Sequence, residues 1–164
     1  MRNKIALALL LSAAPAAAHV SLVEPMAKPG AAIVAHFRVG HGCSGSPTIA
    51  LRVEIPGAVS DAKPQPLPGW TLQTEKAGAR TNSVTWSGGV LAADQPGVFA
   101  IAMTLPSTTG ALVFPATQTC EKGVEQWSEA PAADGHALKN PAPVLTVSPT
   151  PAKTPQPAMP GMKM

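Results

Sequence analysis

Residues 49–57 read Ile49-Ala50-Leu51-Arg52-Val53-Glu54-Ile55-Pro56-Gly57, and this stretch decides the fold. Apolar side chains alternate here with small or charged ones, so the larger apolar residues Ile49, Leu51, Val53 and Ile55 share one face of an extended chain. Pro56-Gly57 ends the run with a turn signal. The pattern predicts a β-strand that turns one face to a core and the other to solvent.

Two further stretches show the same alternation. Residues 33–39 place Ile33, Ala35, Phe37 and Val39 on one face, with His36 on the other, and in residues 98–105 the larger side chains oppose the small Ala100 and Ala102. Weaker patterns predict extended segments at 20–24, 70–73, 83–86 and 111–117. Ser87-Gly88-Gly89 is expected to end the third of these, and Pro115 to make the fourth an edge strand or a bulge.

The composition supports an all-β fold. The chain has 19 Pro and 14 Gly between short apolar runs, which disfavours helices of any length. About seven short strands at this spacing predict a two-sheet antiparallel β-sandwich.

The first 18 residues have the pattern of a secretory signal peptide. Arg2 and Lys4 precede an apolar core at 5–11, and small residues lead to Ala16-x-Ala18. The core is too short to span a bilayer, and no later apolar segment is long enough to do so. We therefore expect cleavage between Ala18 and His19 and a periplasmic or secreted protein with no transmembrane segment.

The cysteines indicate a disulfide, and the charge balance excludes one class of function. Cys43 and Cys120 are the only two cysteines, and in an oxidising compartment they predict one disulfide. Without Arg2 and Lys4, ten Lys and Arg residues face nine Asp and Glu residues, and no basic cluster is present. Such a balance does not indicate a nucleic-acid-binding protein.

Residues 132–164 are expected to form an extended, mobile tail, because they are rich in Pro, Ala and Thr and poor in large apolar side chains. Within this tail, residues 141–150 carry a weak apolar patch that could add an edge strand. The end of the tail gathers Met159, Met162 and Met164. Thioethers are soft ligands that select Cu(I), so these methionines are candidate copper ligands.

Cleavage after Ala18 would make His19 the first residue of the mature chain. Its backbone nitrogen would then be a free amine with a pKa of about 7.7–8.0. A metal ion can displace the proton of this amine and bind the nitrogen. An amine and an imidazole on one residue form a chelate suited to Cu(II).

The ordered motifs resemble the secreted bacterial YcnI-like family, the DUF1775 domain, from His19 to about Pro131. The motifs that carry the resemblance are His19-Val20-Ser21-Leu22, 41–48 (HGCSGSPT), 51–56 (LRVEIP), 64–70 (PQPLPGW), 84–89 (VTWSGG), 114–123 (FPATQTCEKG) and 127–131 (WSEAP). The resemblance implies an immunoglobulin- or cupredoxin-like β-sandwich at 19–131. It also implies an exported protein that binds Cu(II) through its N-terminal histidine, with a carboxylate and a tryptophan close by.

Carried over to this chain, His19 matches the terminal ligand and Trp127 the tryptophan, which either packs in the core or stacks over the metal. Many relatives have a glutamate directly before the position of Cys43, where this chain has Gly42. Three alternatives follow: His41 replaces that ligand, Glu24 completes the site, or water does. Imidazole is the better copper ligand, which favours His41.

The sequence thus predicts a copper-binding protein, not an enzyme, in copper acquisition, trafficking or homeostasis. Its partners would be the copper ion and a membrane copper importer or another periplasmic copper carrier. One alternative is a copper monooxygenase-like enzyme whose histidine brace adds His36 or His41 to His19. The other is a metal-free immunoglobulin-like interaction module.

Overall fold

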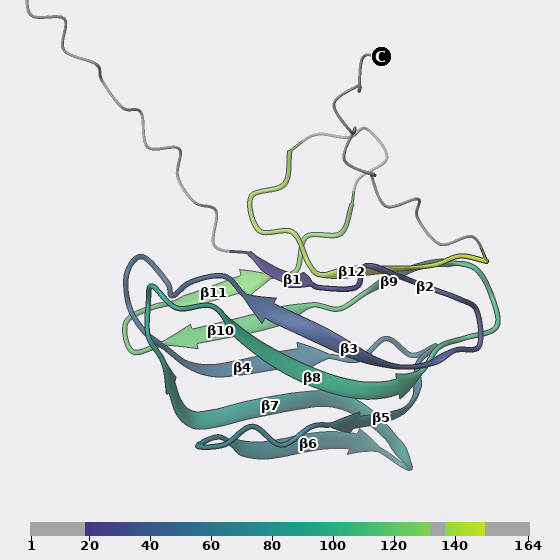
Figure 1. Cartoon of the computed structure of the whole chain (residues 1–164), viewed down its shortest axis with the longest axis horizontal. Coiled ribbons are helices and arrows are strands. Elements are labelled where there is room, and N and C mark those ends of the chain that lie inside the picture. Colours follow the sequence, from purple (N-terminus) through teal and green to yellow (C-terminus); the bar gives the residue numbers. More distant parts are fainter. Residues whose placement is uncertain (1–18, 132–136, 150–164) are drawn as a thin grey trace, which may run out of the picture.

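A computed structural model of the protein describes residues 19–131 and 137–149 (Figure 1). These residues form strands and no helix, as the all-β prediction required. The strands are β1 (Val20–Leu22), β2 (Met26–Ala27), β3 (Ala32–Val39), β4 (Thr48–Glu54), β5 (Ser60–Pro64), β6 (Thr71–Ala77), β7 (Arg80–Leu91), β8 (Gly97–Thr104), β9 (Gly110–Val113), β10 (Ala116–Cys120), β11 (Val124–Trp127) and β12 (Val144–Val147). The described residues contain no helix of sufficient length and apolarity to cross a membrane.

The strands form an antiparallel sandwich with a small third sheet beside it (Figure 1). One sheet has the order β1-β3-β8-β5 and the other has β11-β10-β4-β7-β6. The third sheet, β2-β12-β9, contains a parallel pair, β2 with β12. The predicted sandwich is confirmed, and the third sheet is an addition that the sequence analysis did not anticipate.

The core lies between the two large sheets and contains the predicted apolar faces. Phe37 of β3, Leu51 of β4 and Ile101 of β8 are fully buried. Aromatic rings meet across the layers, with the Trp86 and Phe99 centroids 5.4 Å apart and nearly edge to face. Ile49 departs from the prediction: the register shifts between Thr48 and Ala50, so Thr48 is buried and Ile49 only half-buried.

Glycine did not end the strand predicted at 83–86. Strand β7 continues through Gly88 and Gly89 to Leu91. A Cβ at Gly89 would lie 2.3 Å from Cε2 of Trp70, so the missing side chain makes room for the indole. Gly89 thus allows close packing on the sheet and does not form a turn.

Residues 111–117 were expected to be one strand, and they are parts of two. β9 pairs with β12 in the small sheet, whereas β10 lies between β4 and β11 in the large sheet. Phe114 and Pro115 lie between β9 and β10, and the Pro115 carbonyl accepts a hydrogen bond from the Glu54 amide. Pro115 thus stands where the chain changes sheet, because proline cannot donate to a ladder. The sequence analysis also missed β2, β5 and β11.

The folded part continues past residue 131. Leu145 and Val147 of β12 are buried, and this strand lies between β9 and β2. The weak apolar patch at 141–150 therefore supplies a strand of the fold, in the middle of the small sheet instead of at an edge. The predicted signal peptide and the Met159, Met162 and Met164 cluster lie outside the described residues.

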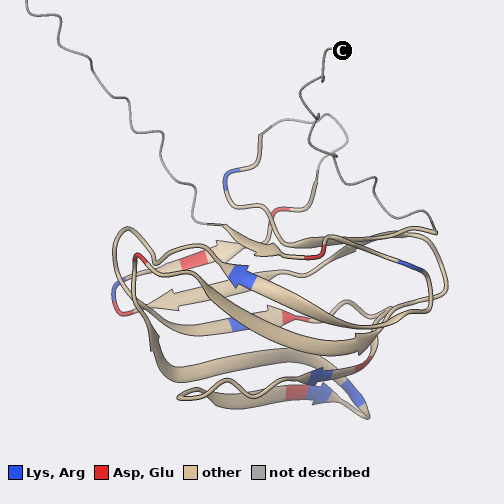
Figure 2. Cartoon of the chain, in the orientation of Figure 1, with Lys and Arg blue, Asp and Glu red and all other residues tan. Residues whose placement is uncertain are grey.

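Charges of both signs are interspersed over the strands and loops (Figure 2). On the outer face of the five-stranded sheet, Arg52 donates from Nη1 and Nη2 to the two carboxylate oxygens of Glu75, at 2.6 and 2.8 Å. The hydrogen bond from Arg52 lowers the pKa of the Glu75 carboxyl.

Candidate metal centre

His19 lies directly before β1, an outer strand of the four-stranded sheet. The pairing of Val20 with Val39 places His19 beside Gly40, which follows β3. A Cβ at Gly40 would lie 3.7 Å from the carbonyl oxygen of His19 and 4.0 Å from its nitrogen. The backbone nitrogen that cleavage would convert to an amine is therefore next to the loop that carries His41.

The indole of Trp127 packs against the imidazole of His19. The two ring centroids are 5.6 Å apart and the planes are tilted by 45°. Trp127 ends β11 and is only 4 % exposed, so its position is fixed by the core. The structure thus brings together the two residues that the sequence analysis selected from opposite ends of the domain.

His41 follows Gly40 and is half-buried. Its Nδ1 lies 2.8 Å from the carbonyl oxygen of Gly42, and a carbonyl can only accept, so Nδ1 carries the proton. In the neutral ring the lone pair then resides on Nε2. A hydrogen bond of this kind fixes the tautomer of metal-binding histidines.

Gly42 has no room for a side chain. A Cβ there would lie 1.9 Å from the carbonyl oxygen of Ser46 and 3.0 Å from Cα of Ala93. Its own N–H donates to the Ala93 carbonyl, which holds the backbone in this place. With the loop in this conformation, position 42 could not accommodate the glutamate that the family resemblance leads us to expect before Cys43.

Glu24 lies beyond the opposite end of β1 from His19. Its Oε2 is 3.0 Å from Nδ1 of His36 on β3, and both side chains are exposed. The structure therefore joins Glu24 to His36 and does not bring it to His19. His36, the second imidazole considered for a brace, is part of this separate pair.

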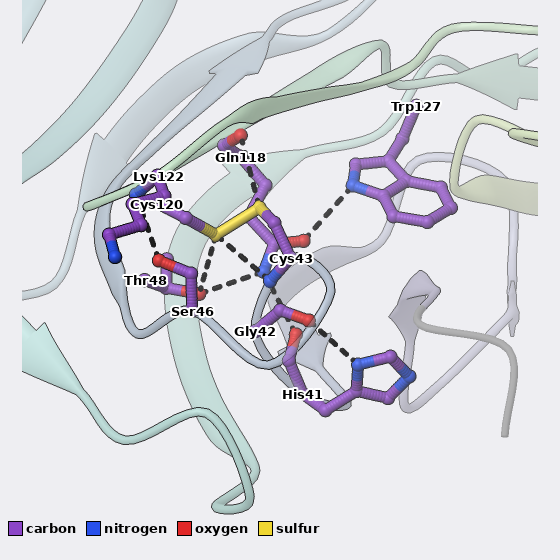
Figure 3. The surroundings of a disulfide bond; sticks show 9 residues. All are labelled: His41, Gly42, Cys43, Ser46, Thr48, Gln118, Cys120, Lys122 and Trp127. Atoms are coloured by element: carbon purple, nitrogen blue, oxygen red, sulfur yellow. Dashed lines mark hydrogen bonds between the residues drawn. A yellow bond between two sulfur atoms is a disulfide. The ribbon is translucent and has the colours of Figure 1, made fainter.

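Gln118 of β10 is a buried polar residue that the sequence analysis did not select (Figure 3). Its Nε2 donates to the His41 carbonyl at 2.9 Å and to Oγ1 of Thr48 at 2.7 Å. Its Oε1 accepts a hydrogen bond from Nε1 of Trp127 at 3.2 Å. One amide thus connects the His41 loop to the tryptophan that packs on His19.

The predicted disulfide is present and lies beside this network (Figure 3). Cys43 and Cys120 are bonded with Cα atoms 6.0 Å apart, and the Cys43 amide donates to Sγ of Cys120. The bond joins the loop after β3 to the end of β10. The described residues contain no other cysteine.

Side chains alone do not form a metal cluster here. Within residues 19–131 and 137–149, no three His, Cys, Asp or Glu residues are grouped so that they could hold a metal ion. A copper site beside His19 would therefore need donors besides these side chains, and the amine that the predicted cleavage would free on His19 would give this one residue two nitrogen donors. That donor set fits Cu(II).

Comparison with known proteins places the chain in a family. The family described as "Domain of unknown function (DUF1775)" matches residues 19–147. The chain belongs to the DUF1775 family. The match ends at Val147, the last residue of β12, so this DUF1775 domain includes the small sheet.

Two solved structures were found to be similar to this DUF1775 domain to different extents. An uncharacterized protein from Nocardia farcinica with an immunoglobulin-like fold is 35% identical, with a TM-score of 0.69, and the alignment covers 79% of this chain and 98% of that one. The seventh ScaB type I cohesin from Pseudobacteroides cellulosolvens is 14% identical, with a TM-score of 0.44, over 88% and 97% of the two chains. No curated protein matches the chain. The similarity to the Nocardia farcinica protein confirms the immunoglobulin-like sandwich.

Proposed function

We propose that this DUF1775 domain is an exported copper-binding protein that holds Cu(II) at its mature N-terminus. The observation that carries the proposal is the packing of His19 against Trp127, 5.6 Å between ring centroids, directly after a predicted signal-peptidase site. A terminal residue that is ordered against a buried aromatic side chain is well placed to hold a ligand.

His19 and His41 would hold the metal. The amine and imidazole of His19 form the chelate, and His41 offers Nε2 because its Nδ1 hydrogen is directed to Gly42. Gly42 supports this ligand set, since the loop leaves no space for the carboxylate that relatives carry there. Copper bound here would supply a stable Cu(II) centre for transfer, and Trp127 would exclude water from one side of the His19 ring.

The biological role we propose is copper acquisition, trafficking or homeostasis in the periplasm or outside the cell. The buried disulfide is compatible with an oxidising compartment. A membrane copper importer or another copper carrier would receive the ion. Met159, Met162 and Met164 would take Cu(I) in such a transfer, because thioethers prefer that oxidation state.

The test compares mature protein that begins at His19 with the same protein acetylated at its N-terminal amine. Acetylation turns the amine into an amide, so tight Cu(II) binding and its electron paramagnetic resonance signal should be lost in the acetylated protein. His19→Ala should lose them too, whereas His36→Ala should not, because His36 pairs with Glu24. Equal binding by mature and acetylated protein would contradict the proposal.

Two further measurements separate the alternatives. Cu(II) should raise the thermal stability of the mature protein, since a ligand bound only by the native state must do so, and no change would favour a metal-free module. The release of oxidised oligosaccharides from a polysaccharide in the presence of ascorbate and copper would favour the copper monooxygenase-like enzyme.

A further inference from the structure

The amide of Gln118 has only one orientation that satisfies its partners. The His41 carbonyl can only accept and the Trp127 indole N–H can only donate. Nε2 must therefore face His41 and Oε1 must face Trp127. The structure shows this orientation, with Nε2 2.9 Å from the His41 carbonyl oxygen and Oε1 3.2 Å from Nε1 of Trp127. In a flipped amide, Nε2 would face the Trp127 N–H, donor against donor, and Oε1 would face the His41 carbonyl, acceptor against acceptor.

The burial of Gln118 makes these hydrogen bonds decisive. Its side chain is 1 % exposed, and the second hydrogen of Nε2 is used by Oγ1 of Thr48 at 2.7 Å. A buried amide is tolerated only when its polar atoms are bonded. The side chain is thus fixed by three partners from three different parts of the fold: the loop after β3, β4 and β11.

From this geometry we infer that Gln118 is a positioning residue for the proposed copper site. It holds Trp127 in the orientation that packs on His19, and it holds the main chain of His41 beside β10. Gln118 thereby sets two sides of the site at once without touching the metal. The inference rests on the proposed function, but the positioning of Trp127 itself can be measured without copper.

Two substitutions remove the positioning bonds to different extents. Gln118→Met keeps the length of the side chain and removes all its hydrogen bonds. Gln118→Glu keeps an acceptor for the Trp127 N–H but cannot donate to the His41 carbonyl while it is ionised. Thr48→Val is the matched control, because it removes a partner of Gln118 and leaves both Trp127 and His41 bonded.

The experiment measures Cu(II) affinity and the electron paramagnetic resonance spectrum of mature parent, Gln118→Met, Gln118→Glu and Thr48→Val. Outer partners of metal ligands typically contribute at least tenfold to affinity, so we expect Gln118→Met to bind about tenfold more weakly with altered spectral parameters. Thr48→Val should keep the parental spectrum and bind within about twofold of the parent. Parental affinity and spectrum in both Gln118 variants would overturn the inference.

The copper-free proteins separate this inference from the proposed function. The nuclear Overhauser contact between the rings of His19 and Trp127, and the near-ultraviolet circular dichroism, should change in Gln118→Met and persist in Thr48→Val. If the parent binds no Cu(II), the proposed function fails, and loss of the ring contact in Gln118→Met still supports the positioning role. A retained ring contact in folded Gln118→Met contradicts that role. If Gln118→Met does not fold, Gln118→Glu tests the His41 side alone: it should keep the ring contact through its bond to Trp127 and bind Cu(II) more weakly, and parental Cu(II) affinity would contradict the positioning role.

Discussion

At the scale of single residues, Gly42 stands where the family resemblance leads us to expect a glutamate, directly before Cys43. A Cβ at this position would lie 1.9 Å from a backbone oxygen, that of Ser46, which no side-chain rotation can relieve. The neighbouring His41 is then the residue of this loop that can supply a metal donor. One missing side chain thus determines which class of ligand the loop offers.

Gly42→Ala should lower the free energy of unfolding by about 1–3 kcal/mol, because overpacking a fixed site forces the backbone to move. Urea denaturation of mature protein measures the change. Gly57→Ala is the control, since a Cβ there would meet only Nη1 of Arg80 at 3.7 Å, and it should leave stability nearly unchanged. A Gly42→Ala protein as stable as the parent would mean that the loop adapts, and the argument for His41 would lose its support.

Sequence reasoning found His19 from the predicted cleavage site and Trp127 from the family resemblance. Gln118 was missed because a glutamine between two threonines looks like an ordinary polar strand residue. A signal was nevertheless present: Ala116 and Cys120, two positions away on either side, are an apolar residue and a disulfide cysteine, and all three are buried. The period-2 pattern of a strand places Gln118 on the same buried face as Ala116 and Cys120. Glutamine is usually exposed, so its residue type did not indicate burial.

At the scale of strands, the alternation rule succeeded wherever the ladder is regular and failed at irregular points. β3 and β8 follow it along their full length, with Phe37 paired to Phe99 and both buried. Ile49 and Pro115 are exceptions that depend on partners far away in sequence, a shift against β7 and a change of sheet. Such features cannot be deduced from a local pattern, because register is a property of two strands.

β12 gives a prediction at this scale. Leu145 is fully buried, so Leu145→Ala should cost about 2–4 kcal/mol of unfolding free energy through lost burial and a cavity. Thr146→Ala, in the same strand with an exposed side chain, should change it by less than about 0.5 kcal/mol. Denaturant titration of the two variants checks this. Equal stabilities would show that β12 contributes no packing to the domain.

At the scale of the whole molecule, the sandwich collects residues from distant parts of the chain along one edge, where β1 and β11 are the outer strands of their sheets. The start of β1, the end of β3 and the end of β11 lie together there (Figure 1). The proposed site therefore depends on the tertiary fold and cannot be reproduced by a short peptide that begins at His19. The sequence indicated the members of the site, and only the strand order reveals that they meet.

The disulfide tests this dependence. It closes a separation of 77 residues, for which the chain-entropy model gives about 4 kcal/mol of stabilisation. The Cys43→Ala/Cys120→Ala double variant should lose about that much unfolding free energy, measured by urea denaturation against the oxidised parent. It should also bind Cu(II) more weakly, because Cys43 is two residues from His41 and the loop is then held by fewer contacts.

The comparison of the two losses identifies what holds the loop. If the double variant remains folded and keeps parental Cu(II) affinity, the hydrogen bond from Gln118 to the His41 carbonyl is sufficient to hold the loop, and the disulfide serves stability alone. If affinity falls and Gln118→Met in the oxidised protein lowers it as well, the loop needs both attachments to β10. A double variant with parental stability would instead contradict the constraint expected from so long a loop.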